Sequence, residues 1–137
     1  MSRLLICGFG PFPEAPDNPA ALAVERLRQE PWAPPGLEAH YAVLPTVWAE
    51  AAQSALDAVK AFAPDGVLLV GVAVSAESFR LETLARNRAN PSHPDALGRC
   101  WPSPRIEAEG PAERGVIAPV QAMAAAIRAQ GLAAALS

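Results

Sequence analysis

Cysteine and histidine are the side chains that most often supply a nucleophile and its base, and this chain of 137 residues has two of each. Cys100 and His93 lie seven positions apart in a proline-rich stretch. A catalytic dyad would need them side by side with the thiol pKa depressed, and such a stretch guarantees neither condition. Together with Asp95, the pair could form a metal site, but the spacing of the three residues matches no known ligand pattern. We therefore predict no metal site.

The other reactive side chains have ordinary structural interpretations. Cys7 ends an apolar run and is predicted to be a small buried hydrophobic residue. His40 falls on a predicted strand, as a partly buried core or edge residue. Glu82 falls in the middle of a predicted strand at 79–85, where alternation places it on one face with Arg80. On spacing alone, Glu82 is a solvated carboxylate near an arginine.

A glycine-rich turn, Gly8-Phe9-Gly10-Pro11-Phe12, follows the first apolar run. Its G-x-G invites comparison with a dinucleotide-binding turn, but the third glycine is missing and Pro11 removes an N–H that would face a phosphate. A sharp turn permitted by glycine is the favoured interpretation. Phe9 and Phe12 follow the carboxyl end of a strand, which is where open α/β sheets bind ligands. The two rings could wall an apolar slot, or either ring could fill the core.

Hydrophobic patterning along the chain alternates between strands and helices. Apolar runs predict strands at 3–7, 38–44 and 67–70. Helical spacing predicts helices at 20–28, 47–62 and 120–129, and 132–137 could begin another strand. Asn18 is expected to cap the first helix with Pro19 at its first position, and Thr46 to cap the second. Three prolines make 30–36 a loop.

This order predicts a single α/β domain over 1–137. Its first three strands should lie side by side in one mostly parallel sheet, because only that arrangement buries both faces of apolar runs separated by helices. Within it, 86–118 holds five prolines and little periodicity, so it is predicted to be a long irregular loop region. Loops of this length are either functional or contain short irregular elements.

Composition excludes several classes of protein. The chain has 11 basic and 14 acidic residues, a net charge of −3 and no polybasic run, which argues against nucleic acid and against an anionic membrane surface. No apolar stretch approaches the length of a transmembrane span, and the N-terminus lacks the features of a signal peptide. Two cysteines form no disulfide framework. We therefore expect a cytoplasmic protein.

Several motifs together suggest a family. The turn Gly8 to Phe12, followed by Asn18-Pro19, resembles the start of pyroglutamyl peptidase I (pyrrolidone-carboxylate peptidase), where G-F-G-P-F precedes N-P. Gly71-Val72-Ala73 is similar to the family's G-x-A, and E-T-L-A-R-N at 82–87 matches its E-x-x-A-x-N. Further matches keep the family's order along the whole chain: Pro45, Pro94-Asp95, Gly98, Gly110-Pro111-Ala112 and Pro119-Val120.

The resemblance implies an α/β fold, a three-layer sandwich with a mostly parallel central sheet, and a Cys–His–Glu hydrolase that removes N-terminal pyroglutamate from peptides. In such an enzyme the thiolate attacks the pyroglutamyl carbonyl, the histidine shuttles the proton and the carboxylate orients the imidazole. Glu82 falls on the family's glutamate, and Phe9 and Phe12 on the aromatics that hold the lactam ring. The implied partner is an N-terminal pyroglutamyl peptide or a related acyl substrate. No cofactor is implied, and a homo-oligomer is left open.

The sequence also departs from the family's pattern. The family's cysteine lies in an A-G-x-Y-L-C-N motif after the strand that follows the third helix, and its histidine lies later still. This sequence ends at Ser137, and none of its cysteines or histidines matches those positions. We therefore expect the chain to lack the C-terminal part of the fold, truncated before the catalytic Cys and His, and to be inactive as given.

Three substitutions bear on the substrate. Val72 stands where many members have a glutamine, and Ala76 and Thr83 each replace a common arginine. These changes weaken the case for pyroglutamate itself and are compatible with a related acyl substrate. The alternative to an enzyme is a non-catalytic α/β module that binds a small apolar or acyl ligand near Phe9 and Phe12.

Overall fold

The structure is a computed structural model that describes residues 1–30 and 32–137. The predicted loop at 30–36 includes Pro31, which lies outside the described residues. The chain forms two units, Met1–Val72 with Ser92–Cys100, and Ala73–Pro91 with Trp101–Ser137. We call them the first unit and the second unit.

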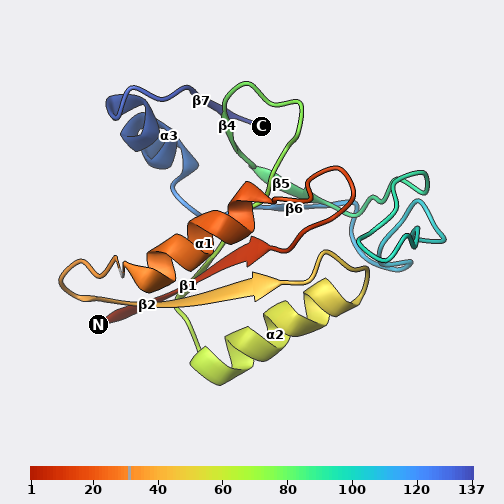
Figure 1. The fold of residues 1–137 in the computed structure, drawn as a ribbon, viewed down its shortest axis with the longest axis horizontal. Coiled ribbons are helices and arrows are strands. Elements are labelled where there is room, and N and C mark those ends of the chain that lie inside the picture. The colour runs from red at the N-terminus through yellow and green to blue at the C-terminus, as the bar shows by residue number, and fades with distance from the viewer. Residues whose placement is uncertain (31) are drawn as a thin grey trace. The chain divides into compact units, whose positions relative to one another are not determined.

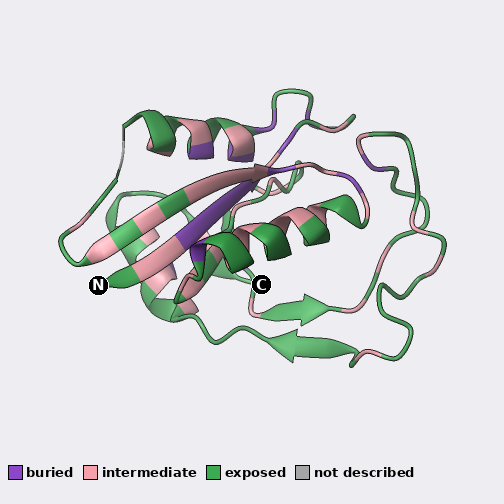
Figure 2. Ribbon diagram, turned by 90° about the horizontal axis from the view of Figure 1, so that it is seen from below, coloured by how far each residue is buried: buried purple, intermediate pink, exposed green. Residues whose placement is uncertain are grey.

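The first unit is built on a three-stranded sheet (Figure 1). Its strands are β1 (Ser2–Phe9), β2 (Leu37–Leu44) and β3 (Gly66–Leu69), and β1 lies in the middle. Both pairings are parallel, with Ser2 opposite Leu37 and Leu4 opposite Gly66. The predicted parallel arrangement of the three apolar runs is confirmed, and Figure 2 shows the middle strand as the most buried of the three.

Two helices, α1 (Pro19–Gln29) and α2 (Glu50–Phe62), cover opposite faces of this sheet (Figure 1). Alternation along β1 explains the division. Leu5 and Cys7 point toward α2, where they form the buried cluster with Leu44 and Phe62. Gly8 points toward α1, and a Cβ placed there would lie 2.5 Å from the carbonyl oxygen of Ala20. The expected α/β/α layering is therefore present, and Gly8 is the residue that lets α1 approach the sheet.

The second helix begins later than its pattern indicates. It starts at Glu50 rather than near 47, and Ala49 before it has a φ of 65°. Thr46 does not cap it, because the Thr46 hydroxyl donates a hydrogen bond to the carbonyl of Gly10 instead, at 2.8 Å. A long-range partner has replaced the local one on which the prediction relied.

The second unit contains two short strand pairs and one helix. β4 (Phe79–Leu81) pairs in parallel with β7 (Ala134–Leu136), and β5 (Leu84–Arg86) pairs antiparallel with β6 (Glu113–Gly115). The helix α3 (Val120–Ala129) precedes β7, as expected from the sequence. Residues 87–112, all of them described, contain neither helix nor strand.

The single strand predicted at 79–85 is two strands. The chain changes partners between β4 and β5: the backbone N–H of Thr83 donates to Ser137, whereas its carbonyl accepts from Val116. No local pattern signals this exchange, because both partners lie more than thirty positions further along the chain. Among residues 1–30 and 32–137, none of the helices has the length and apolar character needed to cross a membrane.

Candidate functional site

The turn that carries the two predicted ring-binding phenylalanines is held by its middle residue, Gly10. The Gly10 N–H donates to the carbonyl of Leu44, which extends the β1–β2 ladder beyond the strands, at 2.8 Å. The Gly10 carbonyl accepts two side-chain hydrogen bonds, from Asn18 Nδ2 at 3.0 Å and from Thr46 Oγ1 at 2.8 Å. The turn is therefore fixed by groups from the start of α1 and from the end of β2.

Asn18 connects this turn to the helix that follows it. Its side chain is almost fully buried, and its Oδ1 accepts from the N–H of Ala20 at 3.0 Å while its Nδ2 donates to Gly10. The first bond satisfies one of the unpaired N–H groups at the helix start. The predicted cap, with Pro19 at the first helical position, is confirmed.

Phe9 and Phe12 occupy different surroundings in this turn. Phe9 is half-buried and packs against the buried cluster of Leu5, Cys7, Leu44 and Phe62. Phe12 is half-buried at the start of a tight turn, where its backbone exchanges two hydrogen bonds with Ala15, at 2.9 and 3.3 Å. Phe9 thus contributes to the core, and both rings keep part of their surface accessible.

Asp95 anchors the segment Ser92–Cys100 in the same unit. Its carboxylate accepts from the backbone N–H groups of Trp48, Leu97 and Arg99 at 2.9–3.0 Å. Desolvation by itself would raise the pKa of Asp95, but these three donors and the Arg99 guanidinium outweigh it and lower the pKa below its ordinary value. The carboxylate is therefore a structural anion, held between a loop and the residues that lead into α2.

From the sequence, Asp95 is a candidate only for a metal site and for the family's order of motifs. An aspartate that accepts from the N–H two residues on is a local turn signal, and Gly98, with a φ of 77°, completes that turn. The adjacent Ala96 N–H donates to the carbonyl of Thr46 at 2.8 Å. Thr46 therefore touches the Gly10 turn through its hydroxyl and the Asp95 loop through its carbonyl.

Glu82, in the second unit, lies at the carboxyl end of β4 and not within a strand. The predicted mid-strand placement beside Arg80 is wrong, because the chain switches partners at this point. The residues on either side of Glu82, Leu81 and Thr83, are both hydrogen-bonded to Ser137. The Ser137 N–H donates to the Leu81 carbonyl at 3.0 Å, and the Ser137 carbonyl accepts from the N–H and the hydroxyl of Thr83 at 2.8 and 2.7 Å. The Glu82 side chain is exposed, and within the described chain its carboxylate has no hydrogen-bond or ion-pair partner.

The parallel β4–β7 register, in which Leu81 lies opposite Leu136, brings Glu82 opposite Ser137. Ligand sites in α/β proteins form at the carboxyl ends of parallel strands, and Glu82 occupies such an end. Phe9 and Phe12 follow the carboxyl end of β1 in the first unit. Because the rings and the carboxylate belong to different units, the expectation that they border one concavity stays a prediction.

The cysteines and histidines do not form a catalytic group. Cys7 is fully buried, and burial raises the pKa of its thiol. Cys100 is exposed, and no hydrogen bond joins it to the exposed His93 in the described residues. His40 lies exposed on the edge strand β2, with its ring stacked on Phe62 at 4.9 Å between centroids. Over the part of the chain that the structure describes, no three His, Cys, Asp or Glu side chains are placed to hold a metal ion.

Comparison with known proteins gives a consistent result. The sequence profile of the pyroglutamyl peptidase family matches residues 2–137. The chain is 35% identical to a pyrrolidone-carboxylate peptidase of Streptomyces coelicolor over 137 residues, covering all of this chain and 62% of the relative. It is 38% identical to that of Levilactobacillus brevis over 130 residues, covering 95% of this chain and 62% of the relative.

Solved structures agree with these relatives. The crystal structure of pyroglutamyl peptidase I from Bacillus amyloliquefaciens matches with a TM-score of 0.90 and 28% identity, over the whole of this chain and 66% of that one. The chain thus spans less than two thirds of the length of the proteins it matches.

Proposed function

Since this chain belongs to the pyroglutamyl peptidase family, we propose that it forms part of a cysteine hydrolase that removes N-terminal pyroglutamate from peptides. The observation that carries the proposal is the position of Glu82, the residue on the family's glutamate, at the end of β4 beside Ser137. The proposed substrate class and the proposed roles of Glu82, Phe9 and Phe12 come from the family resemblance.

The order of elements explains why this position matters. β7 is the strand that follows α3. By the family resemblance, the cysteine motif comes after the strand in this position. In this chain β7 ends at Leu136, and the next residue lies opposite Glu82. The family's cysteine motif would therefore begin at the same end of the β4–β7 pair as the Glu82 carboxylate.

The proposed role of Glu82 is to orient the catalytic histidine and to stabilise the imidazolium that forms when the thiol gives up its proton. The carboxylate is exposed and without a partner in the described residues, so it can accept an N–H from an imidazole. The Ser137 N–H donates to the Leu81 carbonyl, and the Thr83 N–H donates to the Ser137 carbonyl, so the backbone is fixed on both sides of Glu82. These bonds fix the point from which the Glu82 side chain projects, which limits the positions that its carboxylate can take.

The proposed role of Phe9 and Phe12 is to hold the lactam ring of pyroglutamate against their accessible surfaces. The bonds from Asn18 and Thr46 to the Gly10 carbonyl support this role, because they fix the turn between the two rings before any ligand binds. A preformed turn reduces the conformational entropy lost on binding. The ring contact would supply binding energy and leave the reacting carbonyl to the catalytic groups.

A chimeric enzyme tests this function. Residues 1–137 replace the matching part of the Streptomyces coelicolor relative, which then supplies the portion that this chain does not cover. We expect hydrolysis of a fluorogenic pyroglutamyl amide and none of the corresponding prolyl amide, since proline lacks the lactam carbonyl. A folded chimera that cleaves neither amide would contradict the proposal.

A second function, ligand binding without catalysis, is favoured by one observation. The turn of Phe9 and Phe12 is fixed entirely by residues of the first unit, none of which is a proposed catalytic group. Titration of the 137-residue chain with 2-pyrrolidone, followed by the NMR signals of both rings, tests it. Binding by this chain together with an inactive chimera would favour the binding module over the enzyme.

A further inference from the structure

The second unit contains a hollow of about 420 Å³ that none of the roles above uses. Three arginines border it, together with two apolar residues and one acid: Arg86, Arg88, Arg105, Pro104, Ala112 and Glu113. Its borders are the end of β5, the start of β6 and the segment between them that has no regular structure. The hollow therefore lies within a single unit.

Two of the three arginines are free to bind a ligand. Arg86 and Arg88 are exposed, and in the described part of the chain the guanidinium group of neither residue makes a hydrogen bond or an ion pair. Arg86 ends β5, Arg88 lies two positions beyond it, and both residues line the hollow. The two guanidinium groups can therefore approach one ligand together.

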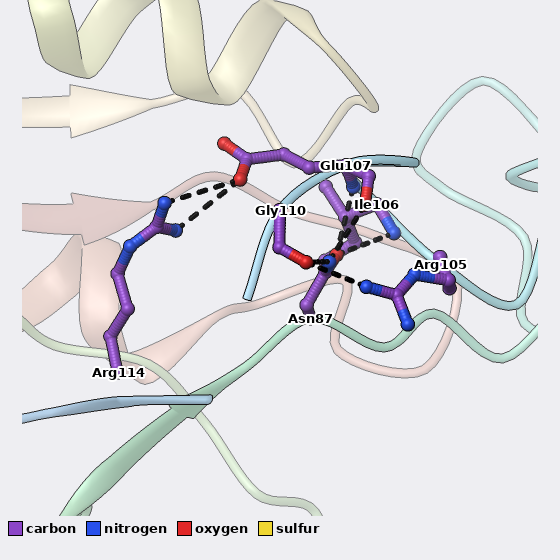
Figure 3. Close-up of polar contacts among 6 residues, drawn as sticks. All are labelled: Asn87, Arg105, Ile106, Glu107, Gly110 and Arg114. Carbon is purple, nitrogen blue, oxygen red and sulfur yellow. Dashed lines mark hydrogen bonds and ion pairs between the residues drawn. The ribbon is translucent and has the colours of Figure 1, made fainter. Parts of the chain in front are cut away.

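The third arginine is held in place, as Figure 3 shows. Arg105 donates from Nη2 to the carbonyl of Gly110 at 2.6 Å, and its other N–H groups remain available. A Cβ on Gly110 would overlap the side chain of Glu107, so the close approach at this point requires glycine. Arg105 is thus a fixed donor on the wall of the hollow.

Asn87 makes this wall rigid (Figure 3). Its Oδ1 accepts from the N–H groups of Ile106 and Glu107 at 2.9 and 2.8 Å, and its Nδ2 donates to the Glu107 carbonyl at 2.7 Å. Its own N–H donates to Ala112 at 2.9 Å. One side chain therefore holds the turn at 106–110, and a hollow in an otherwise irregular segment keeps its shape.

We propose that this hollow binds a peptide carboxylate, from an acidic side chain or a chain end. The lining holds three arginines and one acidic residue, Glu113, so its charge favours an anion. The volume suits a molecule of several heavy atoms rather than one inorganic anion. Pro104 and Ala112 offer apolar surface to the rest of such a peptide. The site does not depend on the proposed peptidase activity.

The test measures peptide binding by the 137-residue chain. The probe is N-acetyl-Ala-Ala-Glu, which carries two carboxylates, and the matched peptide is N-acetyl-Ala-Ala-Gln amide, which carries none. We expect the acidic peptide to bind at least about tenfold more tightly and to weaken as salt is raised, because exposed charges are screened. Neither peptide contains pyroglutamate, so the result is independent of catalysis.

Variants locate the site. Arg86→Gln and Arg88→Gln should each weaken binding of the acidic peptide roughly two- to fivefold, and the double variant about tenfold, because exposed ion pairs contribute little each. Arg80→Gln, which removes the same charge from β4 outside the hollow, is the control and should leave affinity unchanged. Arg88→Lys keeps the charge and should give an intermediate affinity, with the amide NMR spectrum confirming the fold.

Three results would overturn this inference: equal binding of the two peptides, equal weakening by Arg80→Gln and Arg86→Gln, or binding of inorganic phosphate as tight as that of the acidic peptide. The last would show a site for small anions of any kind.

Discussion

The carbonyl of Gly10 offers a direct test of how the candidate ring-binding turn is built. It accepts from Asn18 at 3.0 Å and from Thr46 at 2.8 Å, and Gly10 is buried. Asn18→Ser keeps a good capping residue but is too short to reach Gly10, and Thr46→Val removes the hydroxyl at nearly constant shape. Each single change leaves the carbonyl with one donor, so each should cost about 1 kcal/mol in the free energy of unfolding.

The double variant removes both donors and leaves a buried carbonyl unsatisfied. An orphaned buried acceptor costs roughly 1–3 kcal/mol beyond the lost bond. We therefore expect Asn18→Ser with Thr46→Val to cost about 3–5 kcal/mol in total, more than the sum of the two single changes. The conservative Thr46→Ser, which restores a hydroxyl, should remain within about 0.5 kcal/mol of the parent.

Urea unfolding of the 137-residue chain and its four variants measures these differences through the transition midpoints and slopes. The NMR signals of Phe9 and Phe12 report whether the turn has moved. If the double variant costs no more than the two single changes added together, within about 0.5 kcal/mol, the Gly10 carbonyl does not depend on these donors and the reasoning fails.

Four further predictions follow from the same structure. Gly8→Ala should destabilise the chain by about 1–3 kcal/mol in urea unfolding, because its Cβ would lie 2.5 Å from the Ala20 carbonyl oxygen; an unchanged midpoint would contradict the close approach of α1. The pKa of Asp95 in the folded chain lies below its ordinary 3.8. The ionised carboxylate therefore stabilises the fold above the unfolded-state pKa, and this contribution is lost as pH falls through the lower folded-state pKa. In urea unfolding, Asp95→Asn should consequently lose less stability than the parent between pH 5 and roughly pH 2. In the chimera, Glu82→Gln should lower kcat by about 10²–10⁴-fold with little change in the unfolding midpoint, and equal turnover would remove Glu82 from the mechanism. The 137-residue chain alone should not hydrolyse a fluorogenic pyroglutamyl amide; turnover that is lost in Cys100→Ser would identify the exposed thiol as a nucleophile.

Local sequence patterns determined much of the first unit. β1 and β3 were predictable because continuous apolar runs indicate strands of a parallel sheet, and β2 was predictable from its weak alternation. The start of α1 was predictable as well, because Asn18 followed by Pro19 satisfies the helix end within a few residues. The motifs around Gly8 and Glu82 indicated the family, which the comparisons then showed.

Tertiary structure decided the features whose hydrogen-bond partners lie far along the chain. The Thr46 hydroxyl donates to the carbonyl of Gly10, 36 positions away, and α2 begins at Glu50 instead of beside Thr46. Residues 79–86 form two strands because β4 meets β7 and β5 meets β6, which placed Glu82 at a strand end. Long-range hydrogen bonds also give Asp95 and Asn87 part of their structural roles. Asp95 accepts from Trp48, 47 positions away, and Asn87 holds a turn about 20 positions further along the chain. A polar side chain bonds to whichever donors and acceptors the fold brings within reach, and sequence spacing cannot show which ones those are.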